Sequence, residues 1–300
     1  MNMNPLKTGY SFFSFAENVD LQTAFNHTAK AGYDGAELIF GTNGYLTPNT
    51  KPNDIIHMRK MAEDIGLEIP SVGVWSLWEN NLVSDAPATR QKAEDIILKQ
   101  IDAAYLLGAK TVLIVPGYVG CDFVKNPEKI RYDKAWERAQ NSFAKLAPVA
   151  QSAGIKIGIE NVWNKFLLSP LELVRFIDEI NSESLGIYFD VGNCLYIGYP
   201  EHWIEIFAHR IVQIHLSDYR CSQSGLGAFV DLFAGDVDFS AVSKALAVVK
   251  YEGYLILEML PNYKQFPEIS CFSNKYAVDE IIDMIKASSP SPALSKTDRR

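Results

Sequence analysis

The chain has 300 residues, of which 48% are hydrophobic, and its formal net charge at pH 7 is −8. This composition allows one large core, and the acidic balance supplies no basic surface for a phosphate backbone, so nucleic acid is not expected as a partner. The 4 cysteines are widely spaced and include no CxxC pair, which indicates neither a structural zinc knuckle nor a disulfide framework.

The N-terminal sequence MNMNPLKTGYSFF has no charged region followed by a long apolar stretch and a cleavage site. No run elsewhere in the chain approaches the apolar length of a membrane span. Together with the separated cysteines, these features predict a cytoplasmic protein without a membrane partner.

Apolar runs of strand length alternate along the chain with longer segments of helical period, which is typical of βα units around a parallel sheet. A doubly wound sheet would carry a Gly-rich fingerprint after its first strand, and TGYSFFSFAEN contains none. The pattern therefore predicts an α/β fold, a (β/α)₈ TIM barrel that forms a single domain over residues 1–288, with a flexible tail at 289–300. The predicted strands are Thr8–Phe13, Gly35–Phe40, Glu68–Trp75, Thr111–Pro116, Lys156–Glu160, Leu185–Asp190, Ile211–His215 and Tyr254–Glu258.

The segments between these strands carry helix signals. Leu21, Phe25 and Thr28 share one face of the first helical segment. The pair Ser169-Pro170 before LELVRFIDEI predicts an N-cap followed by proline at the first helical position. The first helical segment covers residues 19–30, and further helices are predicted over residues 88–107, from Asp238-Phe239-Ser240 to near Lys250, and over residues 277–287.

Four polar residues each end an apolar run: Glu160 in KIGIE, Asp190 in LGIYFD, His215 in IVQIH and Glu258 in YLILE. A charged or imidazole side chain at the end of a buried strand is costly unless it faces a polar cavity. The carboxyl ends of barrel strands gather at one face, so the four side chains can converge. Because a cation removes the repulsion among carboxylates, this set predicts a divalent-metal site with mostly oxygen ligands.

The motifs GIEN, YFDVGN, IHLSDY, GDVDF and LILE, in this order on successive strands, resemble the xylose isomerase-like barrel superfamily of sugar-phosphate isomerases and epimerases. This superfamily includes ketose 3-epimerases such as D-tagatose 3-epimerase, and the resemblance extends over nearly the whole chain. It implies that Glu160, Asp190, His215 and Glu258 hold one divalent ion, with Mn²⁺ as the first choice and Mg²⁺, Co²⁺ or Zn²⁺ as alternatives. It also implies that Glu160 and Glu258 act as the acid/base pair.

The resemblance implies a metal-dependent isomerase or epimerase of a ketose or ketose phosphate. A metal that binds the ketone oxygen and the neighbouring hydroxyl acidifies the carbon-bound proton and stabilises an enediolate. One glutamate removes the proton, and the other returns a proton to the opposite face or to the adjacent carbon. The partner is then a small sugar or sugar phosphate, and related barrels also lead us to expect a homodimer or homotetramer.

Three alternatives remain open from the sequence. A lyase of the keto-inositol dehydratase type begins with the same proton abstraction but then expels a β-hydroxyl group. A sugar-binding barrel would hold its metal for structure alone. An abasic-site endonuclease is disfavoured, because only one of the 5 histidines ends a predicted strand and the acidic balance opposes DNA binding.

Five further residues are candidates for substrate binding. Ketose 3-epimerases carry a His three residues after the Asp of the sixth strand, whereas this chain has Asn193, which binds a hydroxyl but cannot carry a proton. Arg220 is the only local match to the Arg expected near the seventh strand. Glu37, read as the end of the second strand, could bind a hydroxyl or form a rim salt bridge. Trp75 and Trp163 could stack on a sugar or simply pack.

Overall fold

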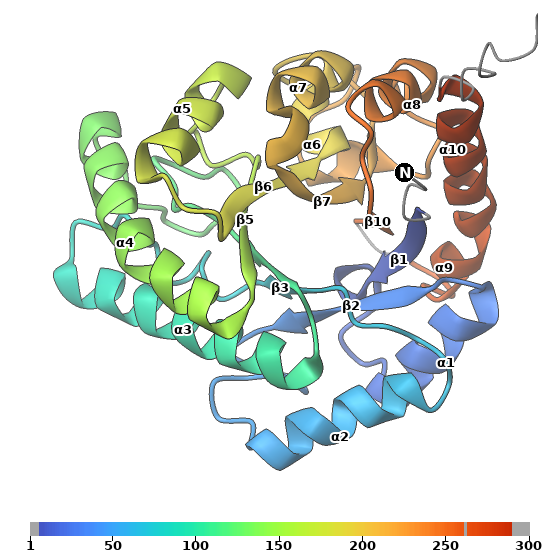
Figure 1. Ribbon diagram of the computed structural model, residues 1–300, viewed down its shortest axis with the longest axis horizontal. Coiled ribbons are helices and arrows are strands. Elements are labelled where there is room, and N and C mark those ends of the chain that lie inside the picture. The colour runs from blue at the N-terminus through green and yellow to red at the C-terminus, as the bar shows by residue number, and fades with distance from the viewer. Residues whose placement is uncertain (1–5, 261–262, 290–300) are drawn as a thin grey trace, which may run out of the picture.

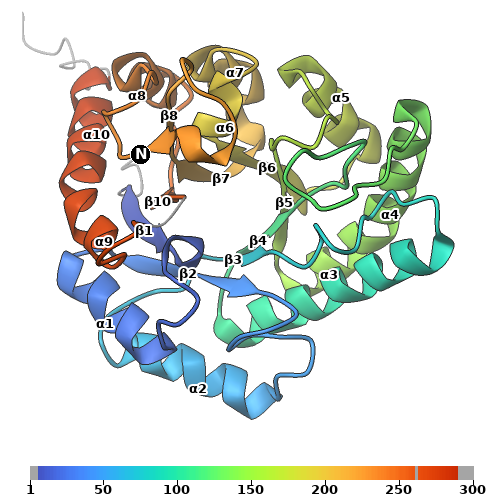
Figure 2. The same cartoon turned by 180° about the vertical axis from the view of Figure 1, so that it is seen from behind.

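A closed barrel of eight parallel strands forms the centre of the computed structural model, which describes residues 6–260 and 263–289. Around the barrel the strands follow the order β1-β10-β7-β6-β5-β4-β3-β2, so strands that are consecutive in the chain pair side by side. The helices form a ring outside the strands (Figures 1 and 2). The predicted (β/α)₈ barrel is confirmed. The barrel strands are β1 (Lys7–Ser11), β2 (Gly35–Phe40), β3 (Ser71–Val74), β4 (Thr111–Ile114), β5 (Lys156–Glu160), β6 (Leu185–Asp190), β7 (Ile211–Leu216) and β10 (Tyr254–Leu257).

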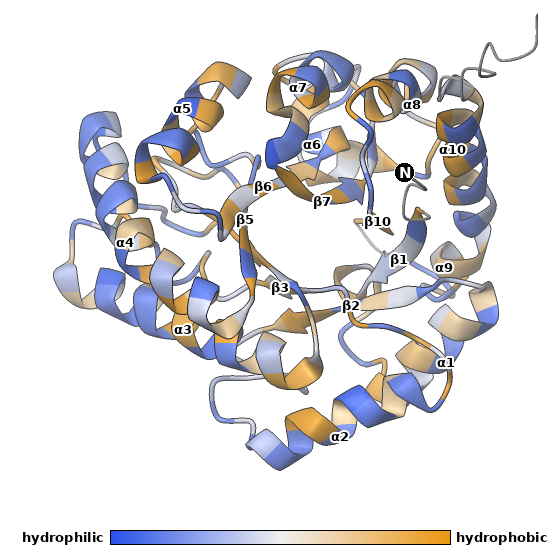
Figure 3. Ribbon diagram, viewed as in Figure 1, coloured by the Kyte–Doolittle hydropathy of each residue, from blue (hydrophilic) through white to orange (hydrophobic). Residues whose placement is uncertain are grey.

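The outer helices carry hydrophobic and hydrophilic residues together (Figure 3), as expected for elements that cover a barrel on one side and meet water on the other. Every residue of β6 is buried, as expected for a parallel strand covered on both faces. The helices are α1 (Leu21–Ala31), α2 (Pro52–Glu63), α3 (Pro87–Leu107), α4 (Tyr132–Ala153), α5 (Pro170–Ile180), α6 (Val191–Leu195), α7 (Pro200–Phe207), α8 (Phe239–Val248), α9 (Ile269–Ser273) and α10 (Lys275–Ser288).

The capping residues predicted from the sequence lie at helix ends in the structure. The Ser169 hydroxyl accepts a hydrogen bond from the Glu172 amide, and Pro170 begins α5, so the predicted cap is confirmed. Helix α3 ends at Gly108, whose φ of 80° is the left-handed conformation that glycine adopts at little cost. Within the described residues, no helix combines the length and the apolar character that crossing a membrane requires.

The strand bounds differ from the prediction mainly at the third strand. Predicted as Glu68–Trp75, it is reduced to Ser71–Val74, and Glu68 contributes only an isolated bridge to Gly35. Pro70 lies between the two and has no amide hydrogen to donate, which interrupts the ladder. The predicted tail at 289–300 lies outside the described residues, apart from Ser289.

A small antiparallel hairpin, β8 (Asp218–Tyr219) and β9 (Phe229–Val230), stands after β7 and outside the barrel sheet. The Asp218 carboxylate accepts hydrogen bonds from the backbone amides of Tyr219, Gly235 and Val237 at 2.8 to 3.1 Å. The long connection after β7 is thereby tied to the end of the barrel where the strands finish.

Candidate metal centre and substrate cavity

The four residues predicted as metal ligands lie together at the carboxyl ends of four barrel strands. Glu160 and Asp190 end β5 and β6, His215 is the last residue but one of β7, and Glu258 directly follows β10. One carboxylate or imidazole atom from each lies within 4.8 Å of the others. The His215 Nδ1 atom is 3.3 Å from Glu258 Oε2 and 3.8 Å from Asp190 Oδ2. Parallel pairing, with Asp190 opposite His215, produces this convergence.

Two atoms of this group are buried without a hydrogen-bond partner among the described residues: Asp190 Oδ2 and His215 Nδ1. The other Asp190 oxygen is satisfied, because it accepts from the Asn193 amide at 2.6 Å and from the Ser217 hydroxyl at 2.8 Å. A buried polar atom left unpaired costs about 1 to 3 kcal/mol. Both unpaired atoms are good ligands for a divalent cation, so the residues present fit a metal ion.

The pKa shifts of the carboxyl groups also fit a bound cation. Burial, followed by the charge of Glu258, raises the pKa of Asp190 to about 7. Burial and then the charge of Glu258 also raise the pKa of Glu160 well above its ordinary value. A divalent ion held among these carboxylates would offset the charges that raise both pKa values.

Glu37 lies in the middle of β2, not at its end, which corrects the expectation from the sequence. It is fully buried, and its Oε1 atom is 2.8 Å from Nε2 of the equally buried His215. The hydroxyls of Ser11 and Ser71 each donate to its carboxylate at 2.7 Å, and the Tyr188 hydroxyl donates to it as well. Glu37 therefore holds a proton on Nε2 of His215, and Nδ1 is the nitrogen that faces Asp190 and Glu258.

The pKa shifts at the Glu37–His215 contact favour the charged form of both side chains. Burial lowers the pKa of His215, but the charges of Glu37 and Glu258 raise it well above its ordinary value. Burial raises the pKa of Glu37, yet the charge of His215 and hydrogen bonds from His215, Tyr188 and Ser71 bring it below its ordinary value. Glu37 does not line the cavity described next. Its position favours orientation of His215 over a contact with substrate.

A cavity of about 90 Å³ borders the four-residue cluster, and Glu160 and Glu258 form part of its lining. Three predicted substrate contacts, Trp75, Trp163 and Asn193, lie on its wall. Arg220 does not; its guanidinium donates to the Ala234 carbonyl at 2.8 Å in the loop after the hairpin. The aromatic residues of the lining are Phe13, Trp75, Trp78, Phe123, Trp163 and Phe229.

Trp163 is fixed by contacts on several sides. Its indole N–H donates to the Asn193 carbonyl at 3.2 Å, which links the loop after β5 to α6. Its ring stacks on Phe229 with centroids 5.3 Å apart and meets the edge of Tyr219 at 5.2 Å. Trp163 therefore offers a rigid apolar surface beside the carboxylates.

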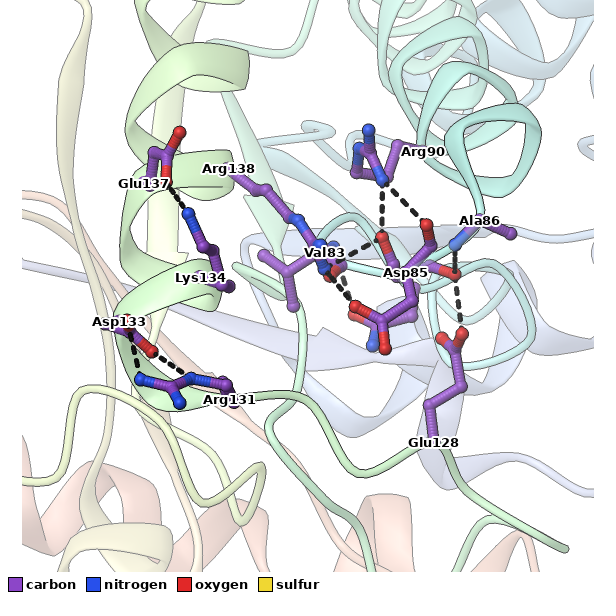
Figure 4. A network of polar contacts seen from close by, with 12 residues as sticks. Val83, Asp85, Ala86, Arg90, Glu128, Arg131, Asp133, Lys134, Glu137 and Arg138 are labelled. Carbon is purple, nitrogen blue, oxygen red and sulfur yellow. Dashed lines mark hydrogen bonds and ion pairs between the residues drawn. The ribbon is translucent and has the colours of Figure 1, made fainter.

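The loop after β3, which contributes tryptophans to the wall, is tied to α4 by the network in Figure 4. Arg138 donates to the Val83 carbonyl at 2.9 Å and pairs with Asp85 at 2.7 Å. The Ser84 hydroxyl donates to Glu128 at 2.7 Å. These bonds hold the loop from the outside, so the wall does not depend on a ligand for its shape.

Two residues of the sequence motifs support the predicted metal ligands indirectly. The Asn161 carboxamide exchanges two hydrogen bonds of 2.8 Å with the backbone of Asp190, which locks the ends of β5 and β6 together. The Gly192 amide donates to the Ser217 hydroxyl at 3.0 Å, and a Cβ at Gly192 would collide with that hydroxyl. Both residues therefore hold Asp190 and its hydrogen-bond donors in place.

Several lining residues were not predicted. Phe13 was included in the first predicted strand, and its place at that strand's end was the signal that could have identified it. Phe123 and Phe229 lie in a loop and in a two-residue strand, where no periodic pattern marks the side that faces the cavity.

The chain matches known proteins over most of its length. The model of the family described as xylose isomerase-like TIM barrel matches residues 25–287. An inosose dehydratase of Clostridium botulinum is 22% identical over 79% of this chain and 81% of that protein. A protein of Haemophilus influenzae, provisionally named L-ribulose-5-phosphate 3-epimerase SgbU, is 24% identical over 88% of this chain and 92% of that protein. The solved structure of an L-ribulose 3-epimerase, 20% identical, has the same fold, with a TM-score of 0.77 over 94% of this chain and 96% of that chain.

Proposed function

Since the chain belongs to the xylose isomerase-like TIM barrel family, we propose that it is a divalent-metal-dependent isomerase or epimerase of a ketose or ketose phosphate. The observation that carries the proposal is the convergence of four ligand atoms within 4.8 Å beside a cavity. The relatives named as an L-ribulose-5-phosphate 3-epimerase and an L-ribulose 3-epimerase support the same class of reaction.

Glu160, Asp190, His215 and Glu258 would hold the ion, and Mn²⁺ is our first choice among Mn²⁺, Mg²⁺, Co²⁺ and Zn²⁺. When bound, it would supply positive charge that polarises the substrate carbonyl and acidifies the neighbouring C–H bond. Glu37 keeps Nδ1 of His215 turned toward this position through the 2.8 Å contact to Nε2.

The chain's own carboxylates would move the protons. Glu160 and Glu258 both line the cavity, and they reach it from β5 and from the end of β10, which are separated in the barrel by β6 and β7. One takes a proton from the substrate carbon, and the other returns a proton at the second position. Return to the opposite face of the same carbon gives an epimer, and return to the adjacent carbon gives the isomeric aldose. The apolar wall, which includes Trp163, limits the access of water to the deprotonated carbon.

A lyase is the second candidate, because a relative over most of the chain is named as an inosose dehydratase. The first proton abstraction would be the same. The difference lies in the next step, in which a β-hydroxyl group leaves in place of reprotonation.

Product analysis in D₂O separates these reactions. The protein is stripped with EDTA, reloaded with Mn²⁺ and incubated with a panel of ketoses and keto-inositols, and the products are read by NMR. The proposal predicts deuterium at carbon without loss of water, and Glu160→Gln should abolish this exchange. The matched control is Glu205→Gln, a change on the exposed side of α7, which should leave exchange unchanged. A dehydrated product, or no exchange with any member of the panel, would overturn the isomerase assignment.

A further inference from the structure

The cavity lining offers very few polar groups beyond the metal ligands. Among the described residues that line it, Asn193 and Ser217 are the only ones with polar side chains besides Glu160 and Glu258, if the indole N–H groups are set aside. No Lys, Arg or His of the described residues lines the cavity. The rest of the wall is aromatic or aliphatic.

Of these two neutral residues, only one is available to a ligand. The Ser217 hydroxyl already donates to Asp190 at 2.8 Å and accepts from the Gly192 amide at 3.0 Å. The Asn193 carboxamide makes no hydrogen bond to the described residues, although its backbone amide and carbonyl are both bonded. A ligand therefore meets one free neutral side chain, while a ketohexose presents several hydroxyls beyond the reacting carbons.

Two cationic side chains in the loops after β5 and β7 are engaged elsewhere. Arg220 donates to the Ala234 carbonyl, and Lys165 pairs with Asp122 at 2.7 Å. A phosphate group carries a charge of about −1.5 to −2 at neutral pH. Buried beside Glu160 and Glu258 without a cation of its own, it would be strongly disfavoured.

On the basis of the proposed function, we propose that the substrate is an uncharged ketose whose end far from the reacting carbons is poor in hydroxyl groups. A 6-deoxyketohexose has this chemistry. Its methyl end would pack on the apolar wall near Trp75 and Trp163, while its oxygens at the reacting end face the carboxylates. A 6-hydroxyl in the same place would lose its water without gaining a partner.

Matched substrate pairs test the inference on the Mn²⁺-loaded wild-type protein. The pairs are 6-deoxyfructose with fructose and 6-deoxytagatose with tagatose, in D and L forms, and the 6-phosphates of the D sugars complete the set. We expect kcat/KM to be about 10-fold to 100-fold higher for the deoxy member of each pair that reacts, as apolar pockets discriminate by about this factor. The 6-phosphates should be the poorest substrates.

A preference for a parent sugar or a 6-phosphate, or equal kcat/KM within a pair, would overturn the inference but leave the proposed function standing. Absence of exchange with every member of this set would overturn the inference, and absence of exchange with ketopentoses as well would overturn the proposed function.

A charge-supplying variant adds an independent readout. Leu226 lines the cavity and is 40% exposed, so Leu226→Lys introduces a cation at the wall without emptying the core. It should raise the ratio of kcat/KM for the 6-phosphate over the deoxy sugar at least 10-fold. The control is Leu171→Lys, at a residue 68% exposed on α5 and outside this cavity, which should leave the ratio unchanged. An unchanged ratio in a folded Leu226→Lys protein would contradict the charge argument.

Discussion

Replacement of Glu37 by Gln tests whether the buried residue beneath the site orients His215. Both side chains are fully buried, and the contact from Nε2 to Oε1 is 2.8 Å. Gln can keep one oxygen toward His215 but removes the negative charge, and a hydrogen bond to a charged partner is roughly twice as strong as a neutral one. The side chain keeps its size, and the hydroxyls of Ser71 and Tyr188 can turn to accept from the new amide.

The expected result is a loss of Mn²⁺ affinity of about 10-fold, at the lower end of the roughly 10-fold to 100-fold range for partners of metal ligands. This corresponds to about 1.4 kcal/mol of binding free energy. Titration calorimetry measures the affinity, and ¹⁵N NMR of the imidazole reports whether His215 still keeps its proton on Nε2. A second population protonated on Nδ1 should appear in the variant.

The matched control is Glu94→Gln on α3, where a carboxylate that is 12% exposed accepts from Ser142 at 2.7 Å far from the cluster. It should leave both readouts unchanged. If Glu37→Gln lowers thermal stability but retains wild-type affinity and a single imidazole tautomer, Glu37 supports only the fold and the orienting role is refuted.

Two further predictions concern pH and packing. In EDTA-treated protein the raised pKa of Asp190, about 7, means that the folded state binds more protons than the unfolded state between about pH 4 and 7, so stability falls as pH rises through this window. Thermal melts at pH 5 to 8 should show this decline, and it should be smaller in Asp190→Asn; an equal or steeper decline in the variant would contradict the assignment. Gly192→Ala should push Ser217 from Asp190 and cost about 1 to 3 kcal/mol of stability together with weaker Mn²⁺ binding. Denaturant titration with and without Mn²⁺ measures stability and metal binding. Wild-type values for stability and for binding would show that the loop accommodates the added methyl group without moving Ser217.

The positions of Glu160, Asp190 and His215 could be predicted because each follows or ends a buried run whose direction is fixed by the parallel barrel. A charged side chain at the end of a buried strand is tolerated only at the open end of the barrel, where the strands finish and the βα loops gather. These residues end neighbouring strands of the barrel, so the strand order alone predicts that their side chains meet.

The roles of Glu37 and Arg220, and the cavity contacts of two phenylalanines, could not be predicted from hydrophobic periodicity. Glu37 stands inside a strand, and its inward direction depends on the register of β2 with β1, where Glu37 faces Ser11. The guanidinium of Arg220 donates to the carbonyl of Ala234, 14 residues later in the chain. This contact depends on how the loop folds and cannot be seen in the sequence. Phe123 and Phe229 reach the cavity from irregular segments for the same reason.

Titration of Mn²⁺ into chelator-treated protein shows whether the four residues bind a metal. We expect one ion per chain, with binding lost or weakened at least 100-fold when His215→Ala and Asp190→Asn are combined, while Glu205→Gln binds as the wild type does. Absence of saturable binding, or binding that the double variant retains in a folded state, would contradict the claim that these four strand ends form a metal site.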